Sequence, residues 1–522
     1  MRTRAVVAAV SVLVPLGCAL LAPRPAAQCP TSYLLTGSPQ FGQSFDVSGD
    51  RLVLGDGSLG FGGTAFVMQH EEWGWFAEYS LFSSAPEGNG RFGDAVAIAG
   101  DWAAVGAPGE AGEAGAVHVF QRVCDPGVPC AWVWVERLQP AQTAAGDRFG
   151  TAVALDASRL VASAPQSDIA AEDAGAVFVF ELAAGTGAGA GDWMQVQTLT
   201  AGAGATPGAG LGSCVALAGA LALAGSKTAN AAWLFEAPAG AGGGAFGAAQ
   251  ELTAPAAGSF GASVATDGVR VLIGSPGSNV TSIKSGAAHL FEPAPGGGWT
   301  QSLLLAPPAP ALFAVFGTSV AIDGPTAAIG STGANAGEGA LRVYRHEGPD
   351  WILHTTLATP LPGPDSSGLG VATALDGDTL AGGARAPLGP PGVVYTFGGI
   401  APWTELGGGL AGSAGLPALQ IGGSLCGGGT LGFTIVGGKP KAAALVVVGL
   451  EATPQPWKGG VLWPAPQIVL PLLLDLAGTG TLAIPIPGGH PAQQAVFAQG
   501  WIADAGAPAG LSATPAVTAE TP

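Results

Sequence analysis

Charged side chains are scarce in this 522-residue chain, and basic ones are the scarcer kind. Lys and Arg number 18 against 36 Asp and Glu, which gives a net charge of −18. A chain with so little basic surface cannot neutralise a phosphate backbone or an anionic lipid surface, so we predict that its partners are neither nucleic acids nor anionic membranes. The negative charge instead suits a soluble extracellular protein whose copies repel one another.

Residues that carry catalysis are also few, and the motifs that organise them are missing. The chain has 6 His, and His70-Glu71-Glu72 lacks the second His of a zinc-protease helix. No Gly-x-Ser-x-Gly elbow is present. A Gly-x-Gly-x-x-Gly match at Gly427 is expected by chance among 87 Gly and opens no predicted helix. Because an enzyme gathers titratable groups in one pocket, the sequence predicts a protein that is not an enzyme and needs no cofactor.

Long apolar runs are confined to the N-terminus. Arg2 and Arg4 precede an apolar stretch over residues 5–22, and small residues end at Ala27. This order is typical of a secretory signal peptide, so we predict that residues 1–27 are removed. The mature chain is then secreted or held at the cell surface without a membrane span. A lipoprotein signal ending at Cys18 is the alternative, although the apolar run continues past it.

Cysteine is another scarce residue, with 6 in the whole chain. Export to an oxidising compartment permits disulfides. Cys124 and Cys130 flank a turn-rich insert, Asp-Pro-Gly-Val-Pro, which predicts a local bridge between them. Cys214 lies in an apolar strand pattern and is expected to be buried, and Cys29 with Cys426 is a second candidate pair. No further Cys or His stands near the first pair to complete a zinc site.

Glycine, by contrast, is abundant, and it recurs at a fixed phase. An aromatic residue or Leu followed by Gly starts each of seven similar segments of about 50–60 residues. A short apolar run, a tight turn and a second run ending near Gly-Ala-Pro follow. Next come a loop and a third run that ends in an aromatic residue, often with a Trp-containing fourth run. The seven pairs are Phe41-Gly42, Phe92-Gly93, Phe149-Gly150, Leu211-Gly212, Phe260-Gly261, Phe316-Gly317 and Leu369-Gly370.

These short runs are rich in Val, Ala, Ile and Phe and bounded by Gly, Asp or Pro, which predicts β-strands. Asp-Gly at Asp267, Asp323 and Asp376 indicates tight hairpins, because that turn needs positive φ. Antiparallel strands repeated around a ring leave only short sheet edges, so we predict an all-β fold with a seven-bladed β-propeller over residues 28–406. An open solenoid is the alternative. We favour closure because residues 33–36 resemble the last strand of a repeat and would complete the final sheet.

The sevenfold pattern resembles the FG-GAP repeats of integrin α-subunit head domains and of secreted bacterial proteins, over residues 41–406. The resemblance implies a seven-bladed propeller, an extracellular location and binding through loops on one face. Family members often carry a calcium loop between the first two strands of a repeat. Here that connection is a bare hairpin, with no room for six to eight oxygen ligands. The acidic cluster Asp168, Glu172 and Asp173, in the next loop of the third repeat, is the candidate calcium site.

After Leu406 the repeat stops. Residues 407–418 are rich in Gly and are predicted to form a linker. Residues 419–522 hold apolar runs separated by Gly and Pro, which predicts a small C-terminal β-sandwich domain. Such a domain would serve in surface attachment or export, or would be a second structural domain.

The sequence therefore predicts a secreted or cell-surface binding protein whose propeller loops recognise an extracellular protein or a glycan. The alternatives are a purely structural surface module and a secreted hydrolase or lyase with its site in the propeller channel. Six Trp residues recur near the fourth run, and their repeat phase favours packing between blades over stacking on sugars. They are Trp75, Trp132, Trp193, Trp299, Trp351 and Trp403.

Overall fold

The computed structural model describes most of the chain from residue 32 onward. The described residues are 32–35, 41–58, 62–71, 74–124, 127–183, 193–238, 244–254, 258–307, 312–348, 350–357, 368–377, 379–385, 392–397, 404–423, 430–485 and 495–520. The predicted signal peptide, residues 1–27, lies outside these ranges, as do Cys29 and Cys426. Within them, no helix is both long and apolar enough to cross a membrane.

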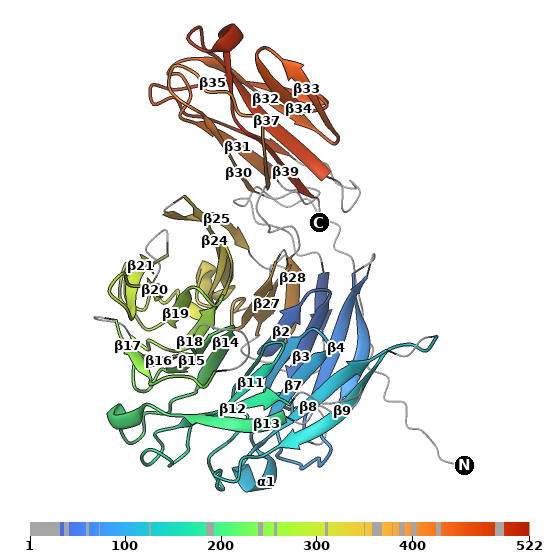
Figure 1. Cartoon of the computed structure of the whole chain (residues 1–522), viewed down its shortest axis with the longest axis vertical. Helices are drawn as coiled ribbons and strands as arrows, with labels where there is room; N and C mark the ends of the chain where they lie inside the picture. The colour runs from blue at the N-terminus through green and yellow to red at the C-terminus, as the bar shows by residue number, and fades with distance from the viewer. Residues whose placement is uncertain are drawn as a thin grey trace. The chain divides into compact units, whose positions relative to one another are not determined.

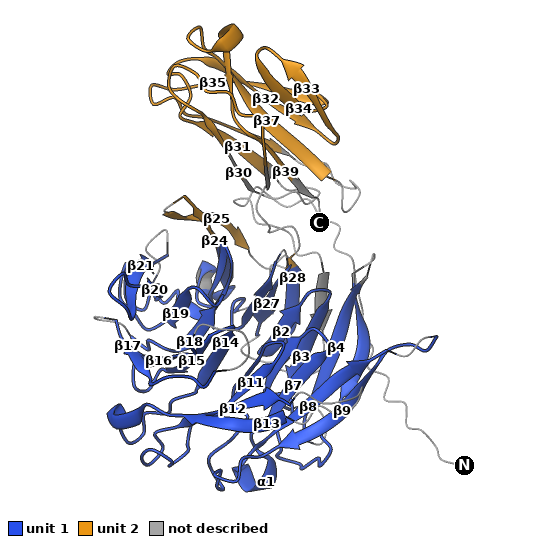
Figure 2. Cartoon of the chain, viewed as in Figure 1, with its two compact units in different colours: residues 1–14, 32–343, 358–396 blue, residues 15–31, 344–357, 397–522 orange. Residues whose placement is uncertain are grey.

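The chain divides into two compact units (Figure 2). From residue 32 onward, the first unit comprises Ser32–Val343 and Ala358–Thr396, and the second comprises Tyr344–Leu357 and Phe397–Pro522.

The repeats form seven four-stranded antiparallel sheets (Figure 1). The first sheet contains β2 (Ser44–Ser48), β3 (Arg51–Asp56), β4 (Thr64–Glu71) and β5 (Gly74–Leu81). The second contains β6 (Ala95–Ala99), β7 (Trp102–Ala107), β8 (Ala116–Val123) and β9 (Ala131–Leu138). The third contains β10 (Val153–Leu155), β11 (Arg159–Ala164), β12 (Ala176–Leu182) and β13 (Trp193–Leu199). The fourth contains β14 (Cys214–Ala218), β15 (Leu221–Ser226), β16 (Ala231–Glu236) and β17 (Gln250–Leu252). The fifth contains β18 (Ser263–Thr266), β19 (Val271–Ser275), β20 (Ala287–Pro293) and β21 (Trp299–Leu305). The sixth contains β22 (Phe316–Asp323), β23 (Thr326–Ser331), β24 (Ala340–Glu347) and β25 (Asp350–Leu357). The seventh contains β26 (Thr373–Asp376), β27 (Thr379–Ala384), β28 (Val393–Phe397) and β1 (Ser32–Leu35).

A strand from the N-terminus completes the seventh sheet. β1 pairs with β28, with Tyr33 opposite Tyr395. The first strands of the sheets contact one another in chain order, from β2 to β6 and onward to β26, and β26 in turn contacts β2. The prediction that residues 33–36 complete the final sheet is thus confirmed for the strand that is described. The ring of sheets is consistent with a β-propeller.

Glycines set how closely neighbouring sheets approach. A Cβ atom on Gly106 would lie 2.1 Å from the carbonyl oxygen of Gly150 in the next sheet, and one on Gly115 would lie 2.0 Å from that of Phe149. Any side chain at these positions would force the sheets apart. Phe149 itself is fully buried in a core shared by the second and third sheets. The fixed phase of Gly in the sequence therefore reflects backbone contact between sheets.

Residues with left-handed backbones pair across the sheet junctions. Arg148 (φ +58°) donates its N–H to the carbonyl oxygen of Glu113 (φ +66°) at 2.9 Å. Val315 (φ +48°) donates in the same way to Lys284 (φ +48°) at 3.0 Å. A β-branched residue rarely adopts this conformation, so Val315 is strained.

The second unit holds three further sheets, built mainly from residues 404–520. The largest has the strand order β29 (Thr404–Gly407), β39 (Ala516–Glu520), β37 (Ala495–Ala503), β32 (Ala443–Gly449), β35 (Ile468–Leu473), with β38 (Leu511–Ala513) paired to β37. The others are β30 (Ala418–Gly423), β31 (Thr430–Val436), β36 (Gly480–Pro485), and the hairpin β33 (Ala452–Trp457), β34 (Gly460–Pro464). Phe433 and Ile435 of β31 and Val446 of β32 share one fully buried core, so the two larger sheets pack on each other.

The predicted linker and the boundary at Leu406 need correction. Thr404 pairs with Thr518 of β39, so the second unit already includes the end of the predicted propeller segment. Within residues 407–418, Leu410 and Ala513 exchange backbone hydrogen bonds of 2.8 and 2.9 Å. Ser413 is also held by Asp504, whose carboxylate accepts its N–H at 2.6 Å. These Gly-rich residues are therefore an ordered part of the second unit, because glycine here permits close packing rather than a free chain.

Candidate functional site

A central cavity of about 480 Å³ lies in the first unit, where the first strands of all seven sheets converge. This volume falls in the range of roughly 300–1,000 Å³ typical of small-molecule sites. Most of the lining residues are aliphatic, with several Thr, Ser and Asp among them, but the surface that faces the cavity is more polar than apolar. The lining residues are Phe45, Asp46, Val47, Ser48, Val96, Ile98, Ala99, Val153, Ala154, Leu155, Val215, Ala216, Leu217, Ala218, Val264, Ala265, Thr266, Asp267, Val320, Ala321, Ile322, Asp323, Thr373, Ala374, Leu375 and Asp376.

Several side chains at the hairpin end of the cavity bind the turn of the next sheet. Asp376 Oδ2 accepts the N–H of Gly49 at 2.6 Å, which links the seventh sheet to the first. Asp323 Oδ2 accepts the N–H of Gly377 at 2.7 Å, which links the sixth to the seventh. Since these oxygens are already engaged by backbone donors, the two carboxylates join neighbouring sheets and help to close the ring.

Asp46 is the titratable group most affected by the cavity. Its carboxylate accepts the N–H of Ile98 in the second sheet and that of Val47, each at 2.9 Å. Burial outweighs these hydrogen bonds, and the nearby charge of Asp376 adds to it, so the pKa of Asp46 rises to about 6.

The chemistry available in the cavity is limited. Its lining includes four Asp but no His, Cys, Lys or Arg. Asp46, Asp323 and Asp376 accept backbone N–H groups from neighbouring sheets, and Asp267 accepts those of Val269 and Arg270. A general base needs an unengaged partner atom facing a substrate, and a nucleophile needs a base beside it. The four carboxylates therefore serve as hydrogen-bond acceptors for the backbone of the hairpins.

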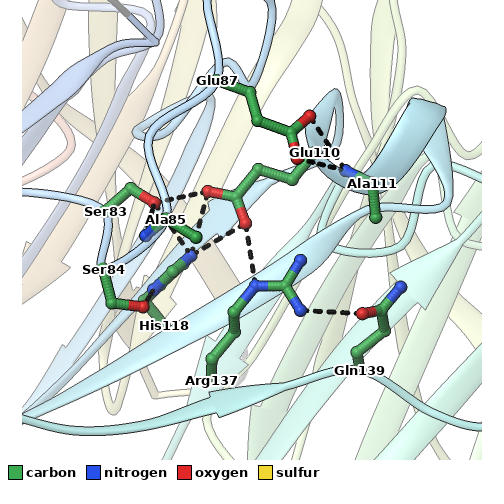
Figure 3. A network of polar contacts seen from close by, with 9 residues as sticks. All are labelled: Ser83, Ser84, Ala85, Glu87, Glu110, Ala111, His118, Arg137 and Gln139. Atoms are coloured by element: carbon green, nitrogen blue, oxygen red, sulfur yellow. Dashed lines mark hydrogen bonds and ion pairs between the residues drawn. The ribbon is translucent and has the colours of Figure 1, made fainter.

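A second polar cluster lies between the first two sheets (Figure 3). Glu110 and His118 are fully buried, and His118 Nε2 lies 3.1 Å from both carboxylate oxygens of Glu110. Ser83 Oγ donates to Glu110 at 2.6 Å, and Arg137 Nε donates at 2.9 Å. Burial opposes ionisation of Glu110, but the hydrogen bonds from His118, Ser83 and Arg137 outweigh it and hold the pKa below its usual range.

The geometry of this cluster indicates a structural role. Ser84 Oγ is 3.5 Å from His118 Nδ1, too far for a good hydrogen bond, and the His118 side chain has no exposed surface. Glu110 comes from the short turn α1 (Glu110–Glu113), His118 and Arg137 from β8 and β9, and Ser83 from the segment after β5. The cluster therefore ties the connection between two sheets to the strands of the second.

His118 and His289 occupy equivalent positions on β8 and β20, the third strands of the second and fifth sheets. His118 packs edge-on against Phe92 at 5.3 Å, and His289 against Phe260 at 5.1 Å. In the third sheet the same position holds Phe178, which packs against Phe149 at 5.4 Å. These histidines therefore occupy a repeat position whose side chain packs against the Phe of the Phe-Gly pair.

The acidic cluster proposed for calcium has a local role. Asp168, Glu172 and Asp173 are all exposed, and Asp168 Oδ1 accepts the N–H of Asp173 at 2.8 Å. In the described ranges, which include these residues, no group of three or more His, Cys, Asp or Glu is arranged to hold a metal ion. Asp168 thus stabilises its own loop, in which Asp173 has a left-handed backbone (φ +50°).

The cysteines that the structure describes are accounted for. Cys124 and Cys130 form a disulfide, with a Cα–Cα distance of 4.2 Å. Cys214 is a free thiol whose Sγ lies 3.3 Å from the carbonyl oxygen of Gly261, and burial raises its pKa to about 12. A thiol with so high a pKa stays protonated at neutral pH and is therefore a poor nucleophile.

Four of the six recurring Trp residues pack in cores between sheets, as their phase predicts: Trp75, Trp132, Trp193 and Trp299. Trp351 is half-buried and packs against His346 of its own sheet at 5.2 Å. Trp132 is buried and donates its indole N–H to Glu78 of the first sheet at 3.1 Å. Trp75 and Trp193 are buried in the same way, whereas Trp403 lies outside the described residues. Other aromatic residues on these outer strands, Phe76, Tyr79 and Trp134, are exposed, and the sequence did not predict this. Alternation of side chains along a strand separates the residues into two faces, but it does not tell which face is exposed to solvent.

Comparison with protein families identifies FG-GAP repeats in the chain. The FG-GAP repeat model matches residues 75–120 and 132–180, so the resemblance inferred from the Phe-Gly pairs is confirmed there. No curated protein sequence matches this chain.

Solved structures resemble the chain only loosely. A candidate 6-phosphogluconolactonase from Bacteroides fragilis matches at 10% identity and a TM-score of 0.42, over 66% of this chain and 95% of its own. The Pyrococcus horikoshii acylaminoacyl peptidase matches at 10% identity and 0.34, over 78% and 60%. A polysaccharide lyase matches at 11% identity and 0.38, over 68% and 90%. These scores assign no activity to this chain.

Proposed function

We propose that this FG-GAP repeat protein is a secreted or cell-surface binding protein, built as a seven-bladed β-propeller followed by a C-terminal β-sandwich, that recognises an extracellular protein or glycan and is not an enzyme. The observation that carries the proposal is the state of the central cavity. Its four carboxylates accept backbone N–H groups, and no His, Cys, Lys or Arg is among the residues that line it. We therefore expect a ligand to bind to the outer surface of the ring and its loops, without chemical conversion in the cavity.

Secretion is supported by the N-terminal leader and by the disulfide between Cys124 and Cys130, since disulfides persist in oxidising compartments. Export of the full chain followed by N-terminal sequencing tests this part. A mature protein that begins at Gln28 is expected. An intracellular protein that retains Met1 would contradict it.

The binding role is tested with the purified mature protein on glycan arrays and against extracellular proteins of the producing cell. Saturable binding to a defined ligand, with no turnover of that ligand, is the expected result. Turnover of an ester, glycoside or polysaccharide that is abolished by Asp46→Asn would favour the hydrolase or lyase alternative instead.

A further inference from the structure

Large aromatic side chains are exposed on two neighbouring outer strands of the first unit. Phe76 and Tyr79 of β5 are 37% and 41% exposed, and Trp134 of β9 is 44% exposed. Aromatic rings bury much apolar area and are normally placed in cores or interfaces. β5 and β9 are the outer strands of two neighbouring sheets and contact each other, so three exposed rings on them mark an interaction surface rather than scattered exposure. We call these three residues the outer aromatic patch.

The strand register places the three rings at one junction between sheets. Phe76 stands opposite Gln69 and Tyr79 opposite Val67, and Val67 belongs to the core between the first and second sheets. Trp134 stands opposite Phe120, which belongs to the same core. Residues opposite each other on paired strands share a face of the sheet. The patch therefore borders the junction of the first two sheets from both sides.

Hydrogen bonds across this junction confirm that the two outer strands are close. Glu78, next to Tyr79, accepts the indole N–H of Trp132 at 3.1 Å and the Nε–H of Arg122 at 2.8 Å. Arg51 Nε also lies 3.4 Å from Glu78. Asp50 pairs with Arg51 at 2.8 Å, and Asp101 lies 3.7 Å from Arg122. The charges beside the patch are thus paired, with a small acidic excess.

The exposed rings and the paired charges beside them indicate which chemical class of ligand would bind to the outer aromatic patch. Aromatic faces stack on the C–H faces of sugar rings, and paired carboxylate and guanidinium groups offer hydrogen bonds to hydroxyls. A polyanion would be repelled by the net charge of −18, and the patch carries no unpaired cation to attract one. We propose that Phe76, Tyr79 and Trp134 bind a neutral oligosaccharide chain. The proposal rests on the proposed binding function and names its ligand class.

Calorimetry on the full mature chain tests this assignment. The probes are cellohexaose, xylohexaose, laminarihexaose and chitohexaose, with hexagalacturonate as the anionic comparator. At least one neutral hexasaccharide is expected to bind, and hexagalacturonate is not. Tyr79→Ala and Trp134→Ala should each weaken that binding by roughly tenfold, the loss expected for one stacked ring.

The matched control is Met194→Ala. Met194 is 58% exposed on β13 and follows Trp193 as Phe76 follows Trp75. Its replacement should leave saccharide affinity unchanged. All variants should keep the wild-type circular dichroism spectrum and melting temperature, because the replaced side chains are exposed.

The outcomes separate this proposal from the proposed function. If a saccharide binds but both aromatic variants retain full affinity, the patch is not its site, although the protein is a binding protein. If an extracellular protein binds and the aromatic variants abolish that binding, the glycan assignment is overturned while the binding function stands. If neither saccharides nor proteins bind, both fail.

Discussion

Val315 combines a β-branched side chain with a left-handed backbone, at φ +48°. At the corresponding positions of the fourth and seventh sheets the residue before the aromatic-Gly-type pair is Gly210 (φ +61°) or Gly368 (φ +83°). A left-handed conformation costs an ordinary L-residue roughly 1–2 kcal/mol, whereas Asn adopts it more readily. The left-handed conformation thus belongs to this position of the repeat, and Val315 adopts it at a cost in stability.

Replacing Val315 with Asn should therefore stabilise the first unit by about 1 kcal/mol. Urea unfolding followed by circular dichroism measures the change. Val371→Asn is the control, because Val371 is also half-buried but lacks a left-handed backbone. An equal or larger gain in the control would show that relief of strain is not the cause.

Asp46 makes stability depend on pH. Its pKa of about 6 in the folded state is above the ordinary value of 3.8. The folded state therefore favours the protonated form, so this contribution is complete below pH 3.8 and is lost as the pH rises through 6. The free energy of unfolding should fall by up to about 1.4 kcal/mol per pH unit between about pH 4 and 6, and should level off above that, where Asp46 is ionised in both states.

Asp46→Asn removes this titration. Urea unfolding of the wild type and the variant at pH 4.5, 6 and 7.5 should show the wild type losing stability relative to the variant as the pH rises. Parallel profiles for the two proteins would mean that Asp46 is ionised throughout this range.

Among the elements, the Gly-rich segment before β30 shows where sequence reasoning succeeded and where it failed. The Phe-Gly phase located the first strand of every sheet, because close approach of backbones requires Gly at fixed points. The same residue type misled the interpretation of residues 407–418, since composition does not distinguish a free chain from one packed against a sheet. The Glu110–His118 cluster was also beyond reach, because Ser83, Glu110 and Arg137 are separated by 27 residues at each step.

Asp504 holds this segment in place in the second unit. It is 1% exposed, and its carboxylate accepts the N–H groups of Ser413 and Gly506 at 2.6 and 2.9 Å. Burial opposes its ionisation, but these hydrogen bonds outweigh burial and lower its pKa to about 2. A carboxylate with a depressed pKa contributes stability above its ordinary value of 3.8, and that contribution is lost as the pH falls toward 2.

Asp504→Ala should destabilise the second unit by about 2 kcal/mol, since buried donors lose a charged acceptor. It should also speed proteolytic cleavage within residues 407–418. Limited proteolysis with mass mapping measures this, and Glu451→Ala, at an exposed position, should cleave at the wild-type rate. Equal rates for all three proteins would indicate that the segment is held by its other contacts.

At the scale of the whole first unit, ring closure joins residues that are distant in sequence. The seventh sheet takes its outer strand from the N-terminus, and Asp376 binds the turn at Gly49 of the first sheet. Neighbouring sheets share buried cores, so each sheet depends on two neighbours for burial. The cavity, the junction beside the outer aromatic patch and the paired left-handed turns all depend on this closed arrangement.

An engineered disulfide between β1 and β28 tests closure most directly. Leu34 stands opposite Val394, and opposed residues on antiparallel strands lie about 4.5–5.5 Å apart, within disulfide range. The variant Leu34→Cys/Val394→Cys should form this bridge in the purified mature protein, as read by non-reducing peptide mapping. The pair Leu34→Cys/Val133→Cys, with its second site on β9, should not. Absence of the first bridge, or equal formation of both, would contradict a ring closed by its N-terminal strand.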